Sequence, residues 1–434
     1  MSHTPELEIH QDIPLKQKLL KKWFWLYFFA FLIAPTGYII KLIAARTMSV
    51  EDIGLFYSIL WLIGIVSSYN DLGLTESLQY FLPKYLIARD YVKAKTLLIT
   101  TWLIQIVSGV IIWSALWFGA PRLAEHYFQS SQTIVVLRIF CGYFVIVNLF
   151  QAMQSLFLAA QDTKTSNGID AARMWTWVLA LILFWQFGMI TIITMTYVWI
   201  IGLIIGIVVA GAIFWRRFGW LIRDNHSDYT LWLFKERIGY AGWVFLWANA
   251  GSLLSQVDLQ FALYFLGKEE AGYWTVYLSL LTAINLITWP LSSYLFPLVN
   301  ELVTKHHHYK LKLLMQYIGW WLVWGAIIIW IGAYFLGPRV ATLLFWESFR
   351  VSGELLTFAA PFVIFGPAVW FAFQYMAGVG KAKQRVRILL SGLVASVISN
   401  LVLIPSMGLK WLIVWMAMSY IVMGFGVMWV IKKR

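Results

Sequence analysis

Residues 41–57 read KLIAARTMSVEDIGLFY, and this stretch joins one long apolar run to the next. Its segment Glu51-Asp52-Ile53-Gly54 recurs 218 residues later, half the length of the chain, as Glu269-Glu270-Ala271-Gly272. Phe144-Val145-Ile146 recurs at the same offset as Phe362-Val363-Ile364. Similarity at a fixed period is the signature of repeated architecture. The spacing therefore predicts a duplicated chain whose halves form two similar bundles.

The composition indicates a membrane protein. Hydrophobic residues make up 61% of the 434 residues and charged residues 12%, whereas soluble domains carry about a quarter charged residues. The 26 Trp and 21 Tyr residues suit a protein with two membrane interfaces, where amphipathic rings collect. The single cysteine, Cys141, supports neither a disulfide framework nor a thiolate metal site. We expect an all-α integral membrane protein.

Windows of about 20 apolar residues, the length that a helix needs to cross a bilayer, predict about twelve transmembrane helices. They are centred approximately on residues 23–45, 53–77, 97–119, 134–158, 172–188, 190–214, 240–265, 273–299, 313–336, 355–377, 388–406 and 411–430. The polar segment before the first window is too long and too acidic for the n-region of a signal peptide. We expect a cytoplasmic N-terminal arm at residues 1–22.

Basic residues alternate between the two sides of this predicted topology. With the N-terminus inside, 25 of the 33 Lys and Arg residues fall in cytoplasmic segments and six in outer segments. This distribution follows the positive-inside rule, and one helix more or fewer would disrupt it. Because the basic residues are spread over seven loops, the net charge of +13 does not indicate a nucleic-acid partner. We expect both termini to be cytoplasmic.

The predicted helices divide evenly between two lobes. Six helices per half is an even number, so both halves start on the cytoplasmic side and the repeat is parallel. The sequence predicts an N-lobe at 23–215, a cytoplasmic linker at 216–238, a C-lobe at 239–431 and a cytoplasmic tail at 432–434. In transporters, two such repeats commonly enclose a site near the membrane midplane.

The first two windows resemble a known family. Residues 41–57, Asp71-Leu72-Gly73-Leu74-Thr75-Glu76-Ser77 and Pro83-Lys84-Tyr85 are similar to the polysaccharide-biosynthesis (O-antigen-type) lipid-linked oligosaccharide flippases of the multidrug/oligosaccharidyl-lipid/polysaccharide exporter superfamily. The resemblance is looser in the seventh and eighth windows, and elsewhere it extends only to the number and length of the helices. It implies two six-helix lobes that move undecaprenyl-diphosphate-linked oligosaccharides to the outer leaflet of a bacterial or archaeal cytoplasmic (inner) membrane.

Such a flippase must supply cations to the substrate head group, because unsatisfied polar groups in hydrocarbon cost several kcal/mol each. Ionisable residues inside the membrane are functional candidates by default. The head-group candidates are Lys41 and Arg46 near the outer end of the first helix, Arg138 near that of the fourth, and Arg173 at the start of the fifth. The competing interpretation is that Lys41, Arg46 and Arg138 extend to the nearby membrane surface.

The repeat also sets cations in the first half against acids in the second. At the offset of 218 residues, Lys41 corresponds to a position beside Asp258, and Arg138 to a position two residues from Glu354. The hypothesis is that these pairs meet across the lobes and close an outer gate in the inward-facing state. The alternative is that the four residues face water or lipid head groups separately.

A coupling proton or cation is the other partner that the resemblance suggests, and two acids are candidates to carry it. Asp71 lies toward the inner end of the second window, and Asp258 lies in the seventh. The competing interpretation for Asp71 is that it caps a helix break beside Gly73.

Enzymatic function is disfavoured, and no cofactor is expected. The H-E-x-x-H and G-x-S-x-G patterns are absent from the sequence. Two alternatives stay open beside the flippase. One is an ion-coupled multidrug or small-molecule exporter of the same superfamily. The other is a membrane glycan polymerase, which would need a large outer loop, whereas the outer connections around 120–132 and 337–352 are short. The expected partners are the lipid-linked oligosaccharide and membrane lipids.

Overall fold

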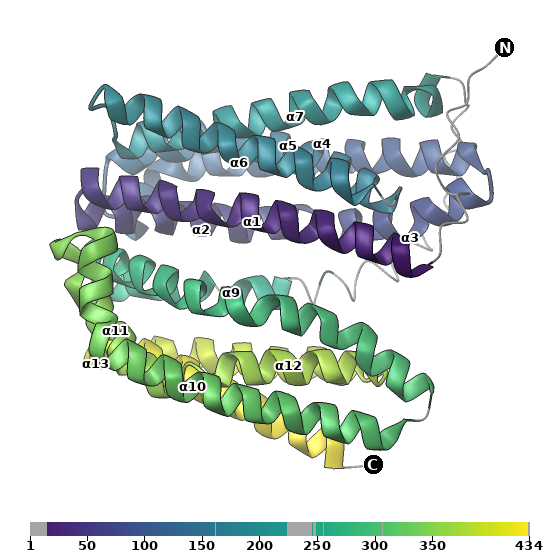
Figure 1. Ribbon diagram of the computed structural model, residues 1–434. Coiled ribbons are helices and arrows are strands. Elements are labelled where there is room, and N and C mark those ends of the chain that lie inside the picture. The colour runs from purple at the N-terminus through teal and green to yellow at the C-terminus, as the bar shows by residue number, and fades with distance from the viewer. Residues whose placement is uncertain are drawn as a thin grey trace. The chain divides into compact units, whose positions relative to one another are not determined.

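All regular secondary structure in the described part of the chain is helical (Figure 1). The computed structural model describes residues 15–160, 162–223, 245, 249–254, 256–305 and 307–432. Among these residues, nine helices are long and apolar enough to cross a membrane, or ten if one bent pair of helices forms a single span. The predicted all-α membrane fold is confirmed. The predicted window at 240–265 lies largely outside the described residues.

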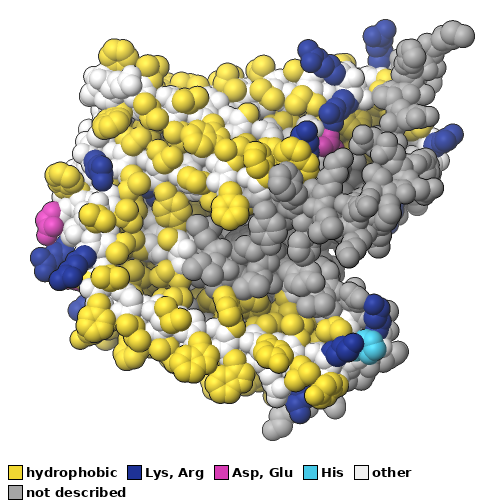
Figure 2. Space-filling view, viewed as in Figure 1, with side chains coloured by type: hydrophobic (Ala, Val, Ile, Leu, Met, Phe, Trp, Pro, Cys, Tyr) yellow, Lys and Arg dark blue, Asp and Glu magenta, His cyan; other side chains and the backbone are white. Residues whose placement is uncertain are grey.

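The outer faces of the helices suit a lipid environment. On the face that Figure 2 shows, hydrophobic side chains cover the helices along their length, while Lys and Arg side chains gather near helix ends. Large apolar side chains are among the most exposed, with Phe118 at 81% and Phe31 at 78%. In water such a surface would be unfavourable, so the side chains are placed as a bilayer requires.

Contacts between residues divide the chain into two units. Unit 1 contains Met1–Ile43 and Val66–Phe245, and unit 2 contains Ala44–Ile65 and Leu246–Arg434. The segment Ala44–Ile65 therefore groups with the second half of the chain, although it belongs to the first half of the sequence repeat. The lobes at 23–215 and 239–431 stay a prediction from that repeat.

Unit 1 is a helical bundle with one apolar core. Its helices are α1 (Leu15–Thr47, most of it), the end of α2 (Val50–Asn70), α3 (Leu74–Ile87), α4 (Tyr91–Arg122), the π-helix η2 (Leu123–Tyr127), α5 (Gln132–Ala159), α6 (Thr163–Gln186) and α7 (Ile192–Arg223). Side chains from α3, α4, α5 and α7 form the core, among them Leu82, Leu97, Phe157 and Phe214. The core thus holds helices together that are distant in sequence.

Helix α7 is longer than the sequence predicted. It continues to Arg223, through the first residues of the linker expected at 216–238. Phe218 and Leu221 are buried in the unit 1 core, and the ring of Trp220 packs edge-on against Tyr91 at 5.0 Å. These contacts stabilise the extra helical turns, which the polar composition of the linker concealed.

The predicted window at 53–77 crosses a helix break. Helix α2 ends at Asn70, and Leu72 and Gly73 then have φ angles of 52° and 70°. Two consecutive left-handed residues cannot continue a right-handed helix. The chain restarts as α3, a 14-residue helix that the sequence did not separate from α2.

Unit 2 has a similar all-helical construction. Beside most of α2, it contains helical residues 249–254 and 256–261, the π-helix η3 (Ala262–Leu266), α9 (Lys268–Thr304), α10 (His308–Phe345), η4 (Glu347–Phe349), α11 (Arg350–Ala359), η5 (Ala360–Phe362), α12 (Phe365–Gly378) and α13 (Ala382–Lys432). Helix α13 is kinked at Gly408, where φ is 69°, and the windows at 388–406 and 411–430 lie on either side of this kink. The predicted outer connection at 337–352 is mostly helical, because α10 runs to Phe345.

The two glycines of the sequence repeat pack against each other at the start of α2 and α9. A Cβ atom on Gly54 would overlap the carbonyl oxygen of Lys268 and lie 2.5 Å from the amide nitrogen of Gly272. A Cβ atom on Gly272 would likewise overlap the carbonyl oxygen of Val50. Only glycine allows backbones to approach this closely, as at the small-residue interfaces of membrane helices.

Further contacts continue along α2. Gln260 donates its Nε2 hydrogen to the carbonyl oxygen of Ser58 at 2.9 Å. Gln256 also packs against α2, with its Oε1 3.2 Å from the Cβ position of Gly64. Small residues and the hydrogen bond from Gln260 therefore fix α2 to the second half of the chain.

Alanine at position 54 tests this contact. In Gly54→Ala the new methyl group meets backbone atoms, so we expect a loss of about 1–3 kcal/mol in stability, as for overpacked cores. Gly119→Ala in α4 is the matched control, because no atom lies within 4 Å of its Cβ position. Alanine there gains helix propensity. Thermal unfolding in detergent should show a lower Tm for the first variant and an equal or higher Tm for the second. Equal Tm values for wild type and Gly54→Ala would contradict the close packing.

Candidate functional site

A buried carboxylate lies in unit 2. Asp258 is 8% exposed and belongs to the helical residues 256–261. Its Oδ1 accepts a hydrogen bond from Nδ2 of Asn400 on α13 at 3.0 Å, and the same Nδ2 lies 3.3 Å from the hydroxyl of Ser396. The Oδ1 of Asn400 has no hydrogen-bond partner among the described residues. A charged group in such an apolar region requires partners, and Asn400 supplies one.

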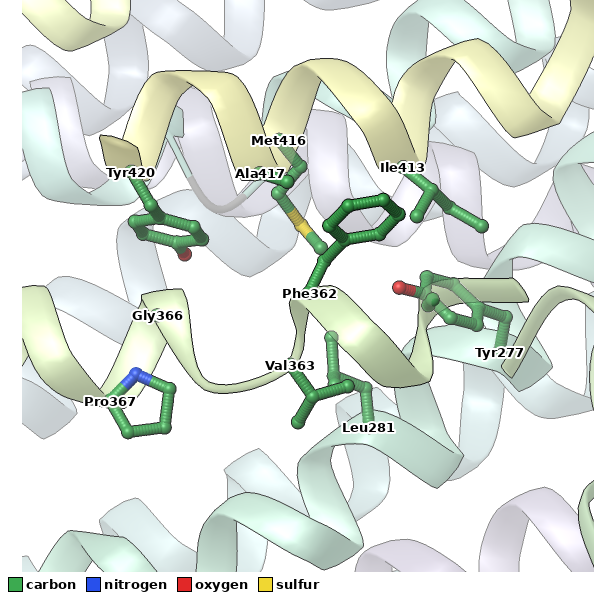
Figure 3. A pocket seen from close by; sticks show the side chains of 11 residues that line it. Tyr277, Leu281, Phe362, Val363, Gly366, Pro367, Ile413, Met416, Ala417 and Tyr420 are labelled. Carbon is green, nitrogen blue, oxygen red and sulfur yellow. The ribbon is translucent and has the colours of Figure 1, made fainter. Parts of the chain in front are cut away.

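A small cavity lies in the same unit (Figure 3). Its volume is about 40 Å³. The residues that line it are Tyr277, Leu281, Ala359, Phe362, Val363, Gly366, Pro367, Ile413, Met416, Ala417 and Tyr420. Figure 3 shows Tyr277 and Tyr420 on opposite sides, with Phe362 and Met416 between them. The volume suits a few water molecules or an ion and is far too small for a glycan.

Arg173 is held by an acid of its own helix. Its Nε and Nη2 donate to Oδ1 of Asp170 at 3.0 and 2.5 Å. The guanidinium also lies over the rings of Trp177 and Phe150, 4.4 and 5.3 Å from their centroids. The side chain is 16% exposed, so packing and hydrogen bonds fix it in place. An anionic head group at Arg173 would compete with Asp170.

The other three cationic candidates have different surroundings. Lys41 is half-buried within the apolar span of α1. Arg138 on α5 is exposed, and its guanidinium lies 5.2 Å from the ring centroid of Trp117 on α4. Arg46 is exposed in unit 2, with Nη2 3.5 Å from the carbonyl oxygen of Leu343. Lys41 is the cationic candidate that lies within the apolar span of α1, where a charged side chain is costly.

The expected gate pairs join residues of different units and stay predictions. Within unit 2, Glu354 lies 3.5 Å from Arg350 on α11, and its side chain is 58% exposed. An exposed pair of this kind contributes little stability and can exchange partners readily. Asp258, by contrast, is committed to the buried hydrogen bond from Asn400.

Asp71 connects three helices of unit 1. Its Oδ2 accepts the backbone N–H of Thr75 at 3.3 Å, and its Oδ1 accepts the Thr75 hydroxyl, so the carboxylate caps the start of α3. Its Oδ1 also accepts Nε2 of Gln105 on α4 at 2.8 Å. Capping and the contact with α4 hold the helix break in one geometry.

The buried amides that accompany these acids were missed in the sequence. Gln105 and Asn400 are fully buried and donate to Asp71 and Asp258, respectively. The available signal was a single polar amide inside each apolar window. Such residues are rare in spans and commonly make hydrogen bonds between helices.

Comparison with known proteins agrees with this architecture. The family model described as "Polysaccharide biosynthesis protein" matches residues 19–303. An uncharacterized membrane protein of Methanocaldococcus jannaschii, MJ1068, is 20% identical over 96% of this chain and 85% of its own length. The relationship thus extends over nearly the whole chain.

Solved structures share the fold at low identity. An inward-facing multidrug resistance MATE family transporter of the MOP superfamily matches with a TM-score of 0.74 and 13% identity, over 92% of this chain and 93% of its own. The lipid II flippase MurJ, in an inward closed conformation, matches with a TM-score of 0.69 and 12% identity, over 95% of this chain and 87% of its own. A MOP superfamily transporter from Pyrococcus furiosus matches with a TM-score of 0.64 and 14% identity, over 93% of this chain and 92% of its own.

These neighbours are two transporters and a flippase, and they share the all-helical fold of this chain. The family predicted from residues 41–57 and their surroundings is confirmed by the match over residues 19–303. The chain belongs to the polysaccharide biosynthesis protein family and has the all-helical fold of the MOP superfamily of membrane transporters.

Proposed function

We propose that the protein is a flippase that moves an undecaprenyl-diphosphate-linked oligosaccharide from the cytoplasmic to the outer leaflet. The observation that carries the proposal is the polysaccharide biosynthesis family match over residues 19–303. The similarity in fold to a lipid II flippase supports a lipid-linked substrate. The distribution of Lys and Arg supports cytoplasmic termini in a cytoplasmic membrane.

The head group needs a path of cations and water through the helices. A diphosphate carries charge that hydrocarbon cannot solvate, while the prenyl tail can stay in lipid. Lys41 lies within the span of α1, and Arg173 lies on α6. Arg46 and Arg138 are exposed and extend the set toward helix ends. We assign the first contact with diphosphate to Lys41, because it lies within the apolar span of α1, where ionisable residues are functional candidates.

Alternating access of the two sequence-defined lobes, 23–215 and 239–431, would move the head group. The contact of Gly54 with the backbone of α9 joins the two halves of the repeat at one end of α2. The other end of α2 groups with unit 1. Helix α2 is therefore tied to both parts of the chain, and opening on the Gly54 side requires this contact to separate.

Removal of the lysine charge tests the head-group path. In proteoliposomes with a short undecaprenyl-diphosphate oligosaccharide, Lys41→Gln should slow transfer between leaflets about ten- to a hundredfold, since hydrogen bonds to charged groups contribute about 1.5–3 kcal/mol. Lys410→Gln is the control, because Lys410 is an exposed lysine near the kink of α13. Equal rates for wild type and Lys41→Gln would remove Lys41 from the path.

The second candidate function is export of a small molecule, which the fold of the multidrug transporter favours. The same proteoliposomes separate the two functions. If wild-type protein moves a cationic dye and leaves the glycolipid in its original leaflet, the flippase proposal is wrong. Transfer of the glycolipid without dye transport supports it.

Asp258 is proposed to contribute to the outer gate or to ion coupling. Asp258→Asn keeps an oxygen that can accept the Asn400 hydrogen bond and removes the negative charge. We expect glycolipid transfer to fall at least fivefold, whereas Glu347→Gln, at an acid whose side chain is 71% exposed, should leave it unchanged. If Asp258 closes the gate, cysteines introduced at the outer end should react faster with thiol reagents in Asp258→Asn than in the wild-type background. If Asp258 couples an ion, glycolipid transfer by Asp258→Asn should no longer depend on the ion gradient. Unchanged transfer and reactivity would exclude both roles.

A further inference from the structure

The helix break in unit 1 gathers buried polar groups around Asp71. Leu72 and Gly73, with φ angles of 52° and 70°, turn the chain between α2 and α3. The turn brings the Asp71 carboxylate against α4, where Gln105 is fully buried and donates to it at 2.8 Å. The remaining amide atom of Gln105, Oε1, has no hydrogen-bond partner among the described residues. One carboxylate and one buried, unengaged oxygen therefore lie together.

Asn70 adds a second amide to this place. Its side chain is 1% exposed, and neither its Oδ1 nor its Nδ2 has a partner in the described part of the chain. The hydroxyl of Ser108 lies 3.4 Å from the carbonyl oxygen of Asn70 and 3.2 Å from that of Gln105. This hydroxyl joins the end of α2 to the turn of α4 that carries Gln105.

Asn148 on α5 lies at about the same height along the helices as Gln105 on α4. The Cβ position of Gly109 is 3.2 Å from the Cα atom of Val145, which fixes the register of the neighbouring helices α4 and α5. One turn back along α4 is Gln105, and, because α5 runs in the opposite direction, about one turn forward along it is Asn148. Asn148 is fully buried, and both its amide atoms lack partners among the described residues.

Bare amides of this kind are costly in a membrane protein. Nearly all buried polar side chains make hydrogen bonds, and an unsatisfied amide costs on the order of 1–3 kcal/mol in proteins. The unengaged oxygen of Gln105 lies beside the Asp71 carboxylate, the bare amide of Asn70 is on the adjacent residue, and the register of α4 and α5 sets Asn148 near Gln105 along the helices. Carboxylate and amide oxygens are the hard ligands that small cations prefer. A single negative charge matches a monovalent cation better than a divalent one.

We infer that Asp71, Gln105 and Asn70, with Asn148 alongside, form a binding site for Na⁺ inside unit 1. Its role as the coupling site rests on the proposed transport function, whereas ion binding itself does not. Because Asp71 also caps α3 and contacts α4, a bound ion would hold the end of α2 in the geometry described here. Binding would thereby be linked to the position of the helix that ties the two halves together.

Binding of ²²Na⁺ to the full-length protein in detergent, with choline as the replacement cation, tests the site. Wild type should bind sodium saturably and unfold at a higher temperature in sodium than in choline. Asp71→Asn retains a side chain that can cap α3, and Gln105→Leu removes the amide; each should weaken binding at least tenfold. Asp90→Asn is the matched control. Asp90 also caps a helix, because its carboxylate accepts the backbone N–H of Lys93 at the start of α4 at 3.1 Å, and it forms an ion pair with the exposed side chain of Lys93.

Three results would overturn the site. The first is no saturable binding by wild type, and the second is undiminished binding by an Asp71→Asn protein that unfolds with a normal cooperative transition. The third is loss of binding in Asp90→Asn as well, because the effect would then follow from any lost capping charge. Failure of glycolipid transfer with sodium binding intact would contradict the proposed substrate and leave this site standing. The two inferences are therefore tested separately.

Discussion

The cost of polar groups in hydrocarbon is the constraint on which this structure depends. It explains why the regular secondary structure of the described chain is all helical, since a helix satisfies its own backbone within the span. It also makes each buried polar side chain informative. Asp258 is paired with Asn400, and Asp71 is held by Gln105 and Thr75. Each of these two carboxylates thus accepts a hydrogen bond from an amide on another helix.

The repeat in the sequence has a structural counterpart. Gly54 and Gly272 occupy equivalent positions in the two halves, and each allows the backbone of the other's helix to approach. Hydrogen bonding from Gln260 to Ser58 continues the contact. A glycine contact of this kind relies on shape and has few strong bonds, so it can separate at moderate cost. This property suits the alternating access that we propose for the two halves.

The sequence predicted the helical membrane fold, its windows and its family, because apolar length and charge distribution record the bilayer directly. It did not locate the break at Leu72 and Gly73, since hydropathy continues across it. Nor did it show that α7 continues to Arg223, because burial of Phe218 depends on distant helices. The partners of the acids were also hidden. Gln105 and Asn400 are single polar residues in apolar segments, and their role follows from three-dimensional packing alone.

We propose that glycolipid transfer requires the two halves to separate at the Gly54 contact. Further along α2, Nε2 of Gln260 lies 2.9 Å from the carbonyl oxygen of Ser58, so Ser58→Cys with Gln260→Cys places one thiol on each side of the contact and leaves both glycines in place. The decisive measurement is the transfer rate of this doubly substituted protein in proteoliposomes, before and after cross-linking with a short bifunctional thiol reagent that a reductant cleaves. Cross-linking should stop transfer, and cleavage of the reagent should restore it. Transfer at the uncross-linked rate with the cross-link intact would contradict the required separation.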